Sequence, residues 1–322
     1  MKLSDGVEQY VVRRRASGHI FEKGESNLTA FSRHVGDVDL RQVRTEQVLT
    51  YLNAPITSTI TWRLKYQMLF RFFDFWASRG VMPELLMPPP RPPVRQTFVP
   101  YIYTRAELRA LLRATARLQN PFRRIERQTL RTFIILLYGT GALVGEMVNL
   151  MHRDVNLEAG MITIRSKSFS RSREIPIGAD MQDVLRKYLN WRSRRNFQSA
   201  NLFVTKDDSP ITNTKVNKNW QRLRVIAGIK RNEGDTYQPR LHDLKFTFAV
   251  HRITSWIRNG ADLNRMLPAL AAYMGQVGMG STERYLHMTP ERFRKELDKL
   301  SPARRKGRWR DNKALMEFLT NL

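Results

Sequence analysis

The sequence predicts a mainly α-helical protein with one small β-hairpin, divided into two domains. Three observations predict this fold class. Apolar residues recur at helical spacing along most of the 322-residue chain. Two short segments, 161–165 and 174–177, instead have the pattern of strands on either side of a polar turn. A run of prolines, which cannot continue a helix, separates the first helices from the rest of the chain.

Residues 1–87 are expected to form the first domain, made entirely of helices. A short helix beginning near Thr45 is expected to have one apolar face, made of Val48, Leu49 and Leu52. Ser58 is a suitable N-cap for a longer helix, and Gly80 is a natural stop just beyond it. The apolar positions expected on the buried side of that longer helix are Trp62, Leu69, Phe72, Phe73 and Trp76.

Residues 88–103 are expected to link the two domains. Five prolines lie within residues 88–93, and such a segment favours an extended, semi-stiff connector. Basic side chains occur in this linker at Arg91 and Arg95, and on the preceding long helix at Arg63, Lys65, Arg71 and Arg79. They are either phosphate contacts or an ordinary solvated surface.

Residues 104–300 are expected to form the second domain. Thr104 and Glu107 have the spacing of a capping box. The apolar residues that follow at helical spacing are Leu108, Leu111, Leu112 and Leu118. A second, buried helix is expected over 127–138, ended by Gly139 and Gly141, and a third begins near Gly145.

The β-hairpin is expected from Met161–Arg165 and Glu174–Ile177, because Ile162 and Ile164 alternate with Thr163 and Arg165. Leu202–Val204 is a candidate for a third strand. The helices expected after the hairpin cover about 180–195, 214–227, 243–258, 262–274, 281–286 and 290–299. The tail, 301–322, is expected to end in a helix over 311–322 whose apolar stripe docks in cis or on a neighbouring protomer.

The charge of the chain indicates a polyanionic partner. Lys and Arg number 55 against 29 Asp and Glu, which gives a formal net charge of +26. A globular protein this basic usually meets phosphate backbone, so double-stranded DNA is the expected partner, with binding that weakens as salt rises. The alternative is a highly charged surface that only confers solubility.

Several classes are excluded by composition. The absence of cysteine excludes disulfides and thiolate metal sites, and the six histidines lack metal-binding spacing. We therefore expect no metal and no cofactor. No apolar stretch reaches the roughly 18 residues of a membrane span, and the N-terminus lacks a secretory signal. A cytoplasmic, nucleoid-associated location is expected.

Four segments resemble the catalytic domain of tyrosine recombinases, the phage integrase family. They are YGTGALVGEMVNL at 138–150, IRSKSFSRSREIPI at 164–177, HDLKFTFAVH at 242–251 and LAAYMGQVGMGSTERYLH at 270–287. The last is the most specific. The resemblance covers essentially the whole chain and implies an N-terminal helical core-binding (SAM-like) domain before a catalytic-type domain. It also implies a role in DNA integration or site-specific recombination, for example of a mobile element.

The resemblance implies a set of catalytic residues. Tyr285 falls at the position of the nucleophile, which attacks a DNA phosphorus to give a 3′-phosphotyrosyl link and a free 5′-hydroxyl. Lys167 falls at the hairpin lysine that protonates the leaving oxygen, and His242 falls at the family histidine. Glu146 matches an acidic supporting residue. Three of these residues also have a plainer interpretation: Tyr285 as a core tyrosine, Lys167 as a phosphate contact and His242 as a structural histidine. His152, His251 and His287 are expected to be structural.

Three positions depart from the family pattern. Leu143 stands where the family has its first arginine, Lys245 replaces the second, and Gln276 replaces a histidine or tryptophan. Losing one preorganised donor to the transition-state oxygens costs about 3–4 kcal/mol. Neighbouring arginines that could reach in, or contact DNA, are Arg165, Arg171 and Arg173.

Three functions therefore stay open. The chain is an active recombinase with altered catalytic positions, a cleavage-deficient accessory subunit beside an active relative, or an architectural or regulatory DNA-binding protein. The resemblance implies a homo- or hetero-oligomer with recombinase relatives, such as a tetramer on two duplexes. No membrane partner is expected.

Overall fold

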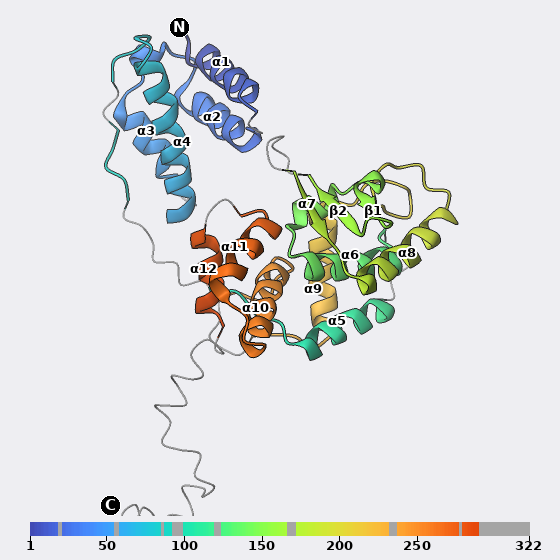
Figure 1. The fold of residues 1–322 in the computed structure, drawn as a ribbon. Helices are drawn as coiled ribbons and strands as arrows, with labels where there is room; N and C mark the ends of the chain where they lie inside the picture. Colours follow the sequence, from blue (N-terminus) through green and yellow to red (C-terminus); the bar gives the residue numbers. More distant parts are fainter. Residues whose placement is uncertain are drawn as a thin grey trace, which may run out of the picture. The chain divides into compact units, whose positions relative to one another are not determined.

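The computed structural model describes residues 1–18, 21–54, 58–84, 87–91, 99–118, 124–165, 172–231, 237–276 and 279–289 (Figure 1). The chain divides into two compact units, one spanning Met1–Phe98 and the other beginning at Val99. Several predictions lie outside the described residues. They concern Arg95, Lys167, Arg171, the helix at 290–299 and the tail at 301–322.

The first unit is helical throughout its described part, as predicted. Its elements are α1 (Leu3–Ala16), α2 (Glu22–Val35), the 3₁₀ turn η1 (Leu40–Gln42), α3 (Thr45–Leu52) and α4 (Thr59–Ala77). The core is rich in aromatic rings that meet edge to face, a favoured geometry for such pairs. Phe31 and Phe73 are one example, with ring centroids 5.9 Å apart.

Helix α4 confirms the prediction made for the long helix. Ser58 is its N-cap, and the Ser58 hydroxyl accepts a hydrogen bond from the backbone N–H of Thr61. All five predicted apolar positions of α4 are buried. In α3, however, the prediction for Leu49 is wrong: its side chain is 40% exposed, and Tyr51 is buried instead. The short helix turns residues 48, 51 and 52 inward, so Leu49 falls on the outer side.

The second unit combines helices with one small sheet. It contains α5 (Arg105–Arg117), α6 (Arg127–Thr140), α7 (Val144–Val148), η2 (His152–Asp154), β1 (Val155–Asn156), β2 (Met161–Ile164), β3 (Arg173–Pro176), α8 (Ala179–Ser193), α9 (Asn213–Ile226), α10 (Asp243–Arg258), α11 (Leu263–Tyr273) and α12 (Met279–His287). The predicted helices that fall on described residues are confirmed, with ends that differ by about two residues. The mainly helical fold class with a small sheet is therefore confirmed.

The capping box at the start of α5 is confirmed. The Thr104 hydroxyl accepts from the N–H of Glu107, and the Glu107 carboxylate accepts from the N–H of Thr104. The predicted end of α6 is partly wrong. Gly139 lies inside the helix, where a side chain would collide with Met181 of α8. Gly141 ends α6 in the left-handed conformation, with φ of 60°.

The sheet is antiparallel in the order β1-β2-β3. Ile162 pairs with Ile175, and Ile162 and Ile164 are both buried, as their alternation predicts. The two-residue strand β1 was not predicted. The third strand predicted at Leu202–Val204 is wrong: its residues are buried, but Val204 makes only an isolated bridge with Pro210. The apolar side chains of this segment are explained by their place in the core and not by pairing with another strand.

Helices α10, α11 and α12 pack against one another (Figure 1). Their shared core includes Phe248, Leu270 and Tyr285, and Phe246 packs on it. Within the described part of the chain, none of the helices is long and apolar enough to cross a membrane. The same residues contain no cluster of three or more His, Asp or Glu side chains suited to a metal ion.

Candidate active site

Three elements of the second unit, α10, α11 and α12, position the predicted catalytic residues that the structure describes. His242 caps α10, Lys245 lies one turn into it, and Tyr285 lies on α12. Gln276 follows the end of α11. His242 and Tyr285 both contact the ring of Phe246. Gln276 bonds to Tyr285, and Lys245 bonds to Met274 in the turn before Gln276.

Tyr285 lies in the core between α10 and α12. Its side chain is only 3% exposed, and its ring meets the edge of Phe246 at a centroid distance of 5.6 Å. Burial raises the pKa of Tyr285, although a hydrogen bond from Gln276 and the charge of Arg284 offset part of the rise. In this structure the hydroxyl is therefore turned into the protein and is predominantly protonated near neutral pH.

Gln276 connects the turn after α11 to the tyrosine. Its Nε2 donates to the Tyr285 hydroxyl over 2.6 Å, and its Oε1 accepts from the Thr282 hydroxyl over 2.6 Å. Both groups of the amide are therefore used on α12. Gln276 can still act as a donor at the position where the family has histidine or tryptophan, but here it donates to the tyrosine.

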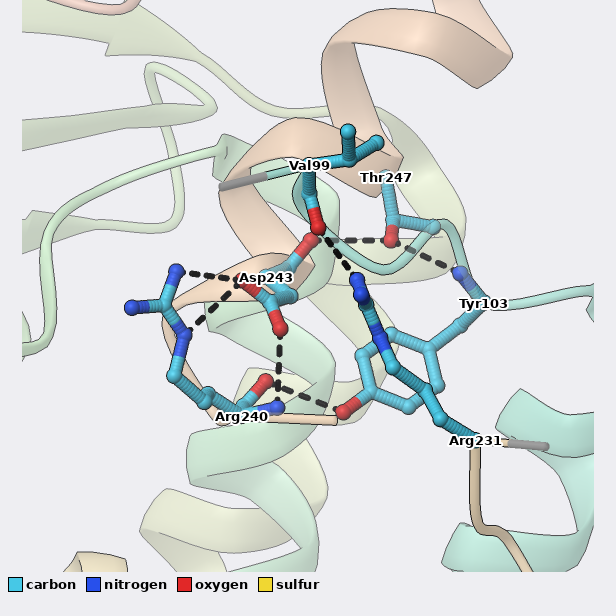
Figure 2. Close-up of polar contacts among 6 residues, drawn as sticks. All are labelled: Val99, Tyr103, Arg231, Arg240, Asp243 and Thr247. Atoms are coloured by element: carbon cyan, nitrogen blue, oxygen red, sulfur yellow. Dashed lines mark hydrogen bonds and ion pairs between the residues drawn. The ribbon is translucent and has the colours of Figure 1, made fainter. Parts of the chain in front are cut away.

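The N-terminus of α10, which carries His242, is fixed by a polar cluster centred on the buried Asp243 (Figure 2). The Asp243 carboxylate accepts from the backbone N–H of Arg240 over 2.8 Å and from the Arg240 guanidinium over 2.9 Å. The hydroxyl of Tyr103 donates to the Arg240 carbonyl, and the N–H of Tyr103 donates to the Thr247 hydroxyl. A carboxylate at a helix N-terminus is also stabilised by the helix dipole.

His242 lies at the start of α10, with part of its surface open to solvent and the rest enclosed by neighbouring protein. Desolvation by the surrounding protein lowers the pKa of His242, and Arg240 and Lys245 lower it further, while Asp243 opposes them. The imidazole is therefore neutral near pH 7, which suits a proton acceptor. Its ring lies 5.7 Å from that of Phe246, the residue that contacts Tyr285.

Lys245 lies between α10 and the end of α11. Its Nζ donates to the Met274 carbonyl over 3.2 Å. Burial lowers the pKa of Lys245 to about 8, with Glu146 opposing this shift and Arg173 adding to it. The ammonium is thus still charged at pH 7 but is poised to lose its proton at mildly alkaline pH.

Arg173, at the start of β3, forms the best-defined ion pair of the site. Its Nη1 and Nη2 donate to the two carboxylate oxygens of Glu146 over 2.7 and 3.0 Å. The two side chains are only 12% and 13% exposed. Burial alone would raise the pKa of Glu146, but the hydrogen bonds from Arg173 and from the N–H of Leu143 outweigh it and lower the pKa.

Leu143 occupies the N-cap of α7 and is 39% exposed. Its side chain offers no hydrogen-bond donor, but its backbone N–H donates to the Glu146 carboxylate over 2.8 Å. The hairpin residues expected near it are only partly described. Arg165 pairs with the buried Asp154 over 2.7 Å, while Lys167 and Arg171 lie outside the described residues.

The candidate DNA contacts of the first unit differ in their availability. Arg71 is exposed, and Arg63 is half-buried on α4. Lys65 lies 4.5 Å above the ring of Tyr51. Arg91 folds back on its own unit, where it donates to Asn53 over 2.8 Å and covers the ring of Trp62. Arg71 and Arg63 are therefore better placed than Arg91 to meet a phosphate.

Sequence reasoning missed two features of the site. Thr282, which supports Gln276, precedes Tyr285 by three residues and so shares its face of α12, a spacing that could have indicated it. The pairing of Arg173 with Glu146 joins residues 27 apart in the sequence, and no local signal indicates it. His251, expected to be structural, lies 2.9 Å from the Tyr138 hydroxyl.

The sequence is similar to that of known recombinases. Residues 103–292 match the phage integrase family model. The putative integrase/recombinase y4rE of Sinorhizobium fredii is 31% identical over 292 residues, which cover 88% of this chain and 91% of that protein. Tyrosine recombinase XerC of Staphylococcus haemolyticus is 25% identical over 294 residues, again covering 88% and 91%.

Solved structures show the same fold. The Tn1549 transposon integrase in complex with transposon right end DNA aligns with a TM-score of 0.64 at 16% identity, covering 94% of this chain and all of that chain. A lambda integrase dimer bound to a COC′ core site aligns with a TM-score of 0.60 at 17% identity, covering 88% and 95%.

Proposed function

The chain belongs to the phage integrase family, and we propose that it binds double-stranded DNA and cleaves and rejoins it through Tyr285. The observation that carries this proposal is the gathering of charged and polar groups at the nucleophile position. Gln276 contacts the Tyr285 hydroxyl, and Lys245 contacts the carbonyl two residues before Gln276. A histidine and a lysine with lowered pKa values, linked to one buried hydroxyl through Phe246 and the turn before Gln276, are typical of a catalytic site.

In the proposed reaction the Tyr285 oxygen attacks a phosphorus of the DNA backbone. A phosphotyrosyl bond forms at the 3′ side, and the bond to the 5′-oxygen breaks. The phenolic proton passes to His242, whose lowered pKa leaves the imidazole neutral near pH 7. Lys167 gives a proton to the departing 5′-oxygen, and Lys245 stabilises the charge on the nonbridging oxygens. Religation reverses these transfers.

The proposal includes a conformational step. Because the Tyr285 side chain is 3% exposed and hydrogen-bonded to Gln276, the hydroxyl must leave this position before it can reach a phosphorus. DNA binding and contact between protomers are the expected causes. The partners proposed are a DNA duplex and further recombinase protomers, since integrases of this fold have been solved as a dimer bound to DNA and as a tetramer on a Holliday junction.

Covalent trapping tests the proposal. A duplex is selected from a random-sequence library by its binding to the full chain and is then nicked near the bound centre, so that cleavage becomes irreversible. A covalent protein–DNA adduct is expected, and Tyr285→Phe abolishes it. Tyr237→Phe, which removes the hydroxyl of a side chain that is 52% exposed, is the control and retains the adduct.

A second candidate function is favoured by Leu143. Where the family has an arginine, this side chain offers no donor, and the nucleophile is buried. The chain would then bind DNA as a cleavage-deficient accessory subunit or as an architectural or regulatory protein. In that case the wild-type chain shifts DNA without forming an adduct. Combining Leu143→Arg, Lys245→Arg and Gln276→His should then create adduct formation that still depends on Tyr285.

A further inference from the structure

We propose that Arg173 holds the nucleophile of this site in its buried position. Its guanidinium fixes the turn Tyr273–Gln276, and from that turn Gln276 holds the Tyr285 hydroxyl. The role in cleavage rests on the function proposed above, whereas the physical link between Arg173 and the turn does not. Arg173 lies outside the motif in which the family has its first arginine.

The guanidinium ties three parts of the unit together. From β3 it reaches both carboxylate oxygens of Glu146 on α7, and its Nε donates to the Tyr273 carbonyl over 2.9 Å. Because the guanidinium is planar, the two-pronged contact with Glu146 also fixes the direction of the Nε–H. The Tyr273 carbonyl is thereby held at the C-terminal end of α11.

Gly275 allows this close approach. Its φ is +67°, and a Cβ added there would lie 2.6 Å from Nη1 of Arg173. The guanidinium therefore packs directly on the backbone of the turn. A side chain at residue 275 would have to displace it, and Arg173 has little freedom to move because three of its N–H groups are already bonded.

The turn then passes this constraint to the tyrosine. Lys245 donates to the Met274 carbonyl, so two cations hold the last carbonyls of α11, the end of a helix that favours positive charge. The Gln276 N–H donates to the Ala271 carbonyl over 2.9 Å. With its backbone held in this way, the Gln276 side chain spans from the turn to Thr282 and Tyr285.

The arrangement also explains how the buried Glu146 carboxylate finds hydrogen-bond donors although Leu143 stands at the position of the family's first arginine. Leu143 supplies a backbone N–H to one oxygen, and Arg173 supplies donors to both. The cation that pairs directly with this buried carboxylate thus comes from β3. We infer that Arg173 acts through the turn and not as a direct clamp on phosphate, since most of its donors are committed to protein acceptors.

Hydrogen exchange of the full chain tests the link, with two pairs of variants. Gly275→Ala should displace the guanidinium while keeping every charge. Gly228→Ala is its control, because Gly228 has the same φ of +67° but open space around it. Arg173→Lys keeps the charge but loses the planar guanidinium that donates to both oxygens of Glu146. Arg186→Lys, at an exposed pair with Asp183 on α8, is the control for that change.

The expected result is local. In Gly275→Ala and Arg173→Lys, amides of residues 274–289 exchange roughly tenfold faster or more, because hydrogen bonds of a charged group are lost. The controls leave exchange there unchanged. Unchanged exchange in Arg173→Lys, or an increase spread evenly over the whole second unit, would overturn the proposal.

The trapping assay separates this inference from the proposed function. If Tyr285 cleaves DNA, Arg173→Lys raises the rate of adduct formation roughly tenfold, because a looser turn holds the hydroxyl less firmly in the buried position that it must leave. The DNA affinity of Arg173→Lys stays close to that of Arg186→Lys. An adduct formed at the wild-type rate would overturn the positioning role. If the wild-type chain forms no adduct but the exchange result holds, the proposed function is wrong and the link between Arg173 and the turn stands.

Discussion

The side-chain amide of Gln276 donates a 2.6 Å hydrogen bond to the hydroxyl of Tyr285. The donor is the residue that replaces the family's histidine or tryptophan, and the acceptor is the proposed nucleophile. Because Thr282 in turn donates to Gln276, the amide cannot rotate without losing a second bond. The three side chains together hold α12 in the position in which the tyrosine is buried.

The first prediction concerns this hold on α12. Thr282→Val removes the hydroxyl that orients Gln276 and should cost about 1 kcal/mol in local stability, the typical value of one hydrogen bond. Amides of α12 are expected to exchange several-fold faster. Thr289→Val is the matched control, because the Thr289 hydroxyl donates to the Tyr285 backbone carbonyl and does not touch Gln276. Equal protection in wild type and Thr282→Val would contradict the prediction.

The second prediction is a pH dependence set by Lys245. With the pKa lowered to about 8, the ammonium loses its charge as the pH rises through 8. The rate of adduct formation should therefore fall between pH 7 and about 9. Lys245→Arg, whose side chain stays charged, should remove this fall. A wild-type rate that stays constant over the same range would show that the charge of Lys245 is not used.

The same shift predicts an effect on stability with the opposite sign. Between pH 8 and the ordinary lysine value of 10.5, the unfolded chain binds a proton that the folded chain does not. The contribution of Lys245 to the free energy of unfolding therefore increases as the pH rises through this window. Urea titrations of wild type and Lys245→Met across the window should show the increase only in the wild type.

The third prediction concerns the polar cluster at the start of α10 (Figure 2). Asp243 is buried and accepts three hydrogen bonds from Arg240. Asp243→Asn should lower the free energy of unfolding by about 2 kcal/mol, the scale of a hydrogen bond to a charged group. Asp183→Asn, at an exposed pair, should cost less than about 1 kcal/mol. Urea denaturation measures both, and equal losses would contradict the prediction.

The fourth prediction concerns DNA binding by α4. Arg71 is exposed, and it is expected to neutralise one phosphate. Arg71→Ala should therefore reduce the slope of log affinity against log salt by about 1. Arg91→Ala is expected to leave the slope unchanged, because Arg91 is engaged with Asn53 and Trp62. Fluorescence anisotropy over a range of salt concentrations measures the slopes.

Much of the fold could be predicted because its signals are local. The Ser58 cap, the Thr104–Glu107 box and the alternation at Ile162 and Ile164 each lie within a few residues of the element they define. Gly139 shows the limit of such reasoning. It resembles a helix stop, but it is a contact point between α6 and α8, and only the packing of two distant segments reveals this.

The candidate site could be predicted in part for a related reason. The positions of Tyr285, His242, Lys245 and Gln276 follow from motifs, but their contacts do not. Whether the tyrosine is buried depends on how α10 and α12 pack, and the Arg173–Glu146 pair joins β3 to α7 across the fold. Long-range pairs of this kind leave no spacing in the sequence from which they can be recognised.

The most direct test of the central claim is to identify the residue that carries DNA after trapping. The full chain is incubated with the nicked duplex and digested, and the peptide that retains a nucleotide is sequenced by mass spectrometry. The account predicts a nucleotide on Tyr285, absent from Tyr285→Phe. A nucleotide on any other residue, or none on Tyr285 in both the wild-type chain and the Leu143→Arg, Lys245→Arg, Gln276→His variant while each binds the duplex, would contradict it.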